Sequence, residues 1–84
     1  MTKPGGESTR PSVTIFEDGS PTLEQAQKLV DGWVELVTLT NGDQLLVNEE
    51  GLMHNLPMNE RASRLAGRLI VGDALVLKGD ARWK

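Results

Sequence analysis

One histidine and two adjacent glutamates are the residues of this chain best suited to acid–base chemistry. His54 is the only histidine, and Glu49 and Glu50 lie shortly before it. A histidine that activates a nucleophile needs a hydroxyl or thiol on one side and a carboxylate on the other, and the spacing here selects no such partners. Adjacent glutamates in an extended chain point to opposite faces, which disfavours a paired-carboxylate site. The sequence therefore predicts no catalytic residue and a protein that is not an enzyme.

The sequence also gives no indication of a metal site or a cofactor site. The chain contains no cysteine, which excludes zinc sites built on sulfur. Asn48, Glu50 and His54 do not form the alternating oxygen pattern of a loop that binds a hard cation. No glycine-rich phosphate-binding string occurs. We predict neither a metal nor a cofactor.

Binding chemistry is more plausible, and it centres on a set of arginines. Arg61, Arg64 and Arg68 are three and four residues apart, so on a helix they could form a basic strip for a phosphate or an acidic peptide. A solvated helix face is the alternative interpretation. The residues that we nominate for binding a ligand or partner are Glu50, Asn55, Asn59, Arg61, Arg64 and Trp33.

Trp33 could either cap the core or belong to an exposed binding surface. Tryptophan is enriched at interface hot spots, but it also caps small cores, and we favour the core or rim role for Trp33. If Trp33 is instead exposed together with Val37, Leu39 and Leu46, these side chains form an apolar patch too large for a comfortable monomer. Such a face would favour a homodimer or the docking of another protein.

Size and charge restrict the class of protein. The 84 residues allow one small domain, and the formal net charge is −3. This charge makes nucleic-acid binding unlikely on general grounds, because that function requires clustered Lys and Arg. No apolar run is long enough to span a membrane, and the N-terminus lacks the apolar stretch of a secretory signal. We therefore expect a cytoplasmic protein.

The chain divides into three parts. Residues 1–11 contain two prolines and two glycines and almost no apolar residue, which predicts a disordered tail. Residues 12–79 form the compact domain, and residues 80–84 form a short exit. The domain begins with a strand at 12–17, followed by a helix whose capping box is Thr22 and Gln25 and whose C′ residue is Gly32.

A hairpin at residues 33–51 is the centre of the predicted fold. Asn41-Gly42 favours a two-residue type I′ turn, since both residues tolerate positive φ. This turn places Thr38 opposite Leu45 and Leu36 opposite Val47. A slip of one residue would exchange the two faces of the hairpin.

The remaining elements complete an α+β fold. Asn59 is a suitable N-cap for a short second helix that ends at Gly67, and residues 74–78 form the last strand. The expected order is β-α-β-β-α-β, a mostly antiparallel sheet packed by one longer and one short helix. A ferredoxin-like sandwich and an incomplete or rolled sheet are both compatible with this order.

Three short strings carry a resemblance to a known family. They are Asn48-Glu49-Glu50-Gly51, Asn55-Leu56-Pro57 followed by Asn59, Arg61 and Ala62, and Ile70-Val71-Gly72-Asp73. In this order, from about Ser12 to Lys78, the chain resembles a family of small proteins from bacteriophages, prophages and actinobacteria that is catalogued as a domain of unknown function. The resemblance implies a single α+β module and no established activity. If a phage encodes the protein, it also implies a location in the host cytoplasm.

Two functions from different classes follow from these observations. The first is a small phage-type accessory protein that binds and modulates a host protein without catalysis. The second is a module that binds or sequesters a small molecule or nucleotide through the Asn55–Arg61 loop. An exposed Trp33 face would favour the first, and a concave polar pocket at the loop would favour the second.

Overall fold

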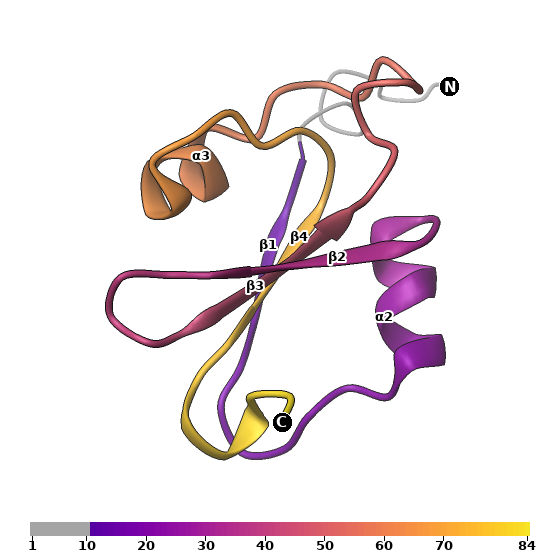
Figure 1. Cartoon of the computed structure of the whole chain (residues 1–84). Coiled ribbons are helices and arrows are strands. Elements are labelled where there is room, and N and C mark those ends of the chain that lie inside the picture. Colours follow the sequence, from indigo (N-terminus) through magenta and orange to yellow (C-terminus); the bar gives the residue numbers. More distant parts are fainter. Residues whose placement is uncertain (1–10) are drawn as a thin grey trace.

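A four-stranded sheet in the order β1-β4-β3-β2 forms the centre of the protein (Figure 1). β1 pairs with β4 in parallel, whereas the β4–β3 and β3–β2 ladders are antiparallel. The computed structural model describes residues 11–84, so the predicted tail lies outside the described residues except for Pro11. The elements are β1 (Val13–Phe16), α2 (Leu23–Val30), β2 (Val34–Thr38), β3 (Gln44–Asn48), α3 (Glu60–Ala66), β4 (Ala74–Leu77) and the 3-10 helix η1 (Gly79–Ala81). The α+β class and the element order are confirmed.

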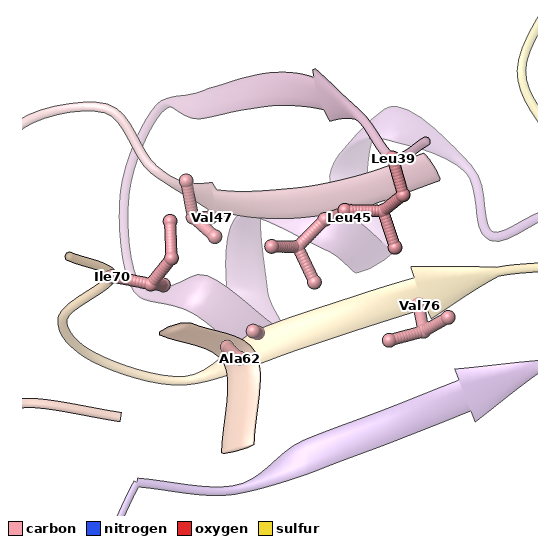
Figure 2. Packing of buried hydrophobic residues seen from close by; sticks show 7 residues of the cluster. Leu39, Leu45, Val47, Ala62, Ile70 and Val76 are labelled. Carbon is pink, nitrogen blue, oxygen red and sulfur yellow. The ribbon is translucent and has the colours of Figure 1, made fainter. Parts of the chain in front are cut away.

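The two helices cover opposite faces of the sheet. On one face, Ala62 of α3 packs with the sheet residues Leu45, Val47 and Val76, as Figure 2 shows. On the other face, Ala26 and Val30 of α2 pack against residues Leu46, Leu75 and Leu77. A ferredoxin-like sandwich, with both helices on one face of an antiparallel sheet, is therefore not the arrangement. The central strand β4 alternates between the two cores, which explains why all four of its residues are buried.

The hairpin register differs by one residue from the predicted one. Leu36 pairs with Leu46 and Val37 with Leu45, so the two-residue type I′ turn was the wrong prediction. The amide of Gly42 donates to Leu39 O (3.0 Å), that of Leu39 donates to Asp43 O (2.8 Å), and Gly42 has φ +92°. This is a three-residue loop in which the glycine follows the turn in the left-handed region.

The slip exchanges the faces of β2 relative to β3. Val37 and Leu39 now share a core with Leu45 and Val47, whereas Leu46 belongs to the core on the α2 side. The proposed Trp33/Val37/Leu39/Leu46 face therefore does not exist as one surface, and Leu39 and Leu46 are both buried. Trp33 is 66% exposed, so the core or rim role that we favoured for it is wrong.

Helix α2 begins as predicted but ends differently. Thr22 Oγ1 accepts from the amide of Gln25 (3.1 Å) and Gln25 Oε1 accepts from that of Thr22 (2.8 Å), a complete capping box. At the C-terminus it is Asp31, with φ +62°, that adopts the left-handed conformation. Gly32 is instead required for close packing, because a Cβ atom there would lie 2.8 Å from Asn48 Nδ2. The glycine permits the close approach of β3 to the end of the helix.

The C-terminal segment packs into the fold rather than leaving it. The sequence predicts a short exit at residues 80–84, yet Ala81 is fully buried. The amide of Trp83 donates to Gln44 Oε1 (2.6 Å), Gln44 Nε2 donates to Trp83 O (2.7 Å), and Trp83 Nε1 donates to Pro21 O (3.0 Å). These bonds join the C-terminal segment to β3 and to the start of α2.

Asn59 should contribute more to stability than an ordinary helix cap. Its side chain is buried, with Nδ2 donating to Ser12 O (3.1 Å) and Gly72 O (2.9 Å) and Oδ1 accepting from the amide of Ala62 (3.1 Å). We expect Asn59→Ala to lower the free energy of unfolding by about 2–4 kcal/mol, because it removes the cap and leaves buried polar groups unpaired. Urea denaturation measures this loss.

The matched control is Thr22→Ala, which removes the N-cap side chain of α2 at an exposed position. Its cost should be about 1 kcal/mol, the usual value for an exposed cap. An equal loss for both variants would contradict the bridging role of Asn59.

One ion pair near the hairpin turn should make the stability of the protein depend on pH. Lys78 Nζ donates to Asp43 Oδ2 at 2.8 Å. This hydrogen bond, opposed by partial desolvation and helped by the lysine charge, lowers the pKa of Asp43 below its ordinary 3.8, and the pKa of Lys78 rises above 10.5. The stabilisation is therefore complete between those two values. It is lost as the pH falls through the lowered Asp43 pKa or rises through the raised Lys78 pKa.

We accordingly expect Lys78→Met to be less stable than the parent protein across the neutral range, and the difference to shrink below pH 3.8. Urea denaturation over a pH series tests this. Lys28→Met, at an exposed position of α2, is the control that should show no such convergence. A difference that stays constant through the acid range would show that the ion pair does not cause the destabilisation.

Candidate functional site

The six nominated binding residues do not come together in one site. Trp33 lines a hollow beside α2, Glu50 lines one beside β3, Arg64 lines one beside α3, and Asn59 and Arg61 line another near Pro11. Asn55 lines none of these four. It is an exposed turn residue with φ +55°. The Asn55–Arg61 loop thus does not gather its polar side chains around one pocket.

Two of the asparagines in the family-like strings are directed inwards. Asn48 Nδ2 donates to Val30 O (3.0 Å) and Asp31 O (3.1 Å), and its Oδ1 accepts from the amide of Glu50 (2.7 Å). Asn59 is bonded equally fully, as described above. These carboxamides hold backbone segments together, and they position Glu50 and α3 rather than contact a ligand.

The three family-like strings meet at one junction. A Cβ on Gly51 would lie 2.7 Å from Val71 Cγ2, and a Cβ on Gly72 would lie 2.7 Å from Leu56 Cδ1. The amide of Gly72 donates to Pro57 O (2.8 Å), and Met58 forms an isolated bridge with Val71. The loop after β3 therefore packs directly on the segment that leads into β4.

In front of this junction lies a surface that we name the Leu69 groove. It consists of two hollows, of about 290 and 380 Å³, that share Arg68 and Leu69. Its exposed apolar side chains, each at least half exposed, are Leu52, Met53, Met58 and Leu69. Leucine and the flexible, polarisable methionine are suited to contact with an apolar partner.

The charges of the groove are unevenly distributed. Arg68 Nη2 lies 3.4 Å from Glu35 Oε2, so these two charges compensate each other. Glu49 and Glu50 are both exposed at the other end, where Glu50 Oε1 lies 3.5 Å from His54 Nε2. Arg64 borders the hollow next to α3. The predicted basic strip is thus divided, and the end formed by the loop after β3 is acidic.

The comparison with protein families gives a match over almost the whole chain. The family described as Domain of unknown function (DUF3846) matches residues 2–83. The chain belongs to the DUF3846 family. The match extends beyond the Ser12–Lys78 stretch that suggested it. No curated protein and no solved structure matches the chain.

Several residues of the Leu69 groove were missed by sequence reasoning. Leu52 and Met53 lie in the turns that follow β3. Leu69 is 55% exposed, whereas its neighbour Ile70 is buried. One signal in the sequence could have revealed this surface of the DUF3846 protein. Leu52, Met53, Met58 and Leu69 are apolar but lie outside the helices and strands, and such residues must either join a core or stay exposed.

Residues 11–84 contain neither a metal-binding cluster nor a membrane-spanning helix. Within this range no group of three His, Asp or Glu side chains is placed to hold a metal ion. In the same part of the chain, none of the helices combines the length and the apolarity needed to cross a membrane.

Close packing at Gly51 should make the junction sensitive to one methyl group. We expect Gly51→Ala to be destabilised, because its Cβ would collide with Val71 Cγ2 and overpacking costs roughly 1–3 kcal/mol. Adding Val71→Ala removes the colliding atom. The double variant should therefore lose less stability than the sum of the two single variants in urea denaturation. Simple additivity would show that the two residues are not in contact.

Proposed function

We propose that this DUF3846 protein is a non-enzymatic protein-interaction module that binds an extended segment of a partner protein in the Leu69 groove. The observation that carries the proposal is the clustering of exposed apolar side chains, Leu52, Met53, Met58 and Leu69, around two adjoining hollows. Contiguous exposed apolar surface on a small protein is typical of interaction sites. Aliphatic anchors surrounded by charges are the expected anatomy of such an interface.

The charges favour a partner segment of a particular composition. Since Glu35 and Arg68 compensate each other, Glu49 and Glu50 give the loop end of the groove an acidic character. Apolar residues of the partner would contact Leu69 and Met53, and a Lys or Arg would lie near the two glutamates. If the protein is phage-encoded, as the family resemblance suggests, the partner would be a protein of the host cytoplasm.

The nucleotide-binding alternative receives less support. It requires polar groups free to bind a ligand on the Asn55–Arg61 loop. The carboxamide of Asn59 is already used in three internal hydrogen bonds. Asn55 and Arg61 do not line a common hollow.

Selection from a random peptide library displayed on a carrier tests the proposal. We expect enrichment of peptides that combine apolar residues with Lys or Arg. Leu69→Glu should weaken their binding by about tenfold or more, because it places a charge within an apolar contact. Raising the salt concentration should also weaken binding, since Glu49 and Glu50 are exposed.

The matched control is Leu23→Glu, which changes an exposed leucine of similar accessibility at the start of α2. It should leave peptide binding unchanged. Absence of any enriched composition, or equal losses for both variants, would reject the Leu69 groove as the binding surface. Circular dichroism of each variant confirms that it is folded.

A further inference from the structure

The edge of β2 presents unpaired backbone groups. The amide of Glu49 donates to Trp33 O (2.8 Å), and that of Leu39 donates to Asp43 O (2.8 Å). Because bonded and non-bonded residues alternate along an antiparallel ladder, the odd-numbered residues of β2 bond to β3. The amide and carbonyl groups of Val34, Leu36 and Thr38 are directed away from the sheet. In the described part of the chain, β2 is the last strand on this side.

This edge strand has few of the features that usually prevent the association of sheet edges. Natural edge strands are protected by proline, lysine, bulges or inward-pointing charges. The sequence of β2 is VELVT, with one charged residue and no proline or lysine. That residue, Glu35, lies 3.4 Å from Arg68 of the same chain, which compensates its charge. Leu36 is 41% exposed in the middle of the strand.

We propose that two copies of the protein associate through β2, antiparallel, about a two-fold axis that passes beside Leu36. In this register Leu36 lies opposite Leu36 of the second copy, and Val34 lies opposite Thr38. All three outward-directed residues of each strand are then hydrogen-bonded. The two four-stranded sheets join into one continuous sheet.

Charge selects this register over its neighbours. A shift by one pair in one direction places Glu35 opposite Glu35 of the second copy, and directly opposed like charges are destabilising. A shift in the other direction places Val34 opposite Thr40, in the hairpin loop, and removes it from the ladder. In the Leu36-centred register, Glu35 lies opposite Val37 and keeps its contact with Arg68.

The proposed dimer would also place the two Leu69 grooves relative to each other, although the dimer does not require that the grooves bind a partner. A two-fold axis perpendicular to a continuous sheet places the same face of both copies on the same side. The two Leu69 grooves, on the face that carries α3, would then be presented together. A partner with two binding segments would gain avidity from this geometry, whereas the dimer itself requires only the edge of β2.

Single cysteines test the register, because the chain has no cysteine of its own. In Leu36→Cys the two Cα atoms would be about 5.5 Å apart, within the range of a disulfide. In Thr38→Cys they would be more than about 12 Å apart, since four residues separate them along the strands at ~3.4 Å each. We expect mild oxidation to give a covalent dimer of the first variant and not of the second, on a non-reducing gel. Equal cross-linking of both variants would overturn the register.

Sedimentation over a dilution series tests the dimer without cysteine. The parent protein should sediment as a dimer that dissociates on dilution, and Leu36→Lys should be a monomer because two ammonium groups would oppose each other. A parent protein that is monomeric at every concentration would overturn the proposal. Leu69→Glu should remain a dimer, so loss of peptide binding and loss of association are separable results.

Discussion

The buried carboxamide of Asn59 joins three segments that are far apart in the sequence. It binds the carbonyl groups of Ser12 and Gly72 and caps α3 through Ala62. Because these bonds fix where α3 begins, Ala62 is placed on the sheet and the helix returns towards β4. Ser63 Oγ then bonds to the amide (2.8 Å) and the carbonyl (3.2 Å) of Ile70. Leu69 is held next to a fixed segment while its own side chain faces solvent, so one wall of the groove follows from the cap.

A second constraint is the length of the hairpin loop. With three residues between Leu39 and Asp43, the side chains of Val37 and Leu39 join those of Leu45 and Val47 in one core. Leu36 is left on the other face at 41% exposure, and its backbone groups are directed away from β3. A two-residue loop would have paired Leu36 with Val47 instead. β2 is the edge strand in either register. The slip that completes one core therefore decides that the backbone groups of Leu36, and not those of Val37, are left free for the association that we propose.

Local signals predicted the elements but not the surfaces. Thr22 and Gln25 for α2, and Asn59 and Gly67 for α3, identify helix ends because their chemistry acts within one turn. Asn41-Gly42 is compatible with a two-residue turn and with a three-residue turn that ends in a left-handed glycine, so it could not fix the register. Asn59 was nominated for binding because a sequence does not reveal whether a polar side chain points inwards. The Leu69 groove combines residues from separate loops, which no local pattern places together.

The residues of the family-like strings and the residues that line the proposed binding surface are mostly different. Gly51 and Gly72 belong to the family-like strings and are explained by close packing, as Asn48 and Asn59 are by internal hydrogen bonds. The exposed apolar residues of the groove, Leu52, Met53, Met58 and Leu69, do not belong to the positions that define those strings. A scaffold fixed in this way permits substitutions at the groove without disturbing the junction behind it. The packing of the family-like strings thus builds the junction behind the groove, whereas the binding that we propose depends on the exposed side chains in front of it.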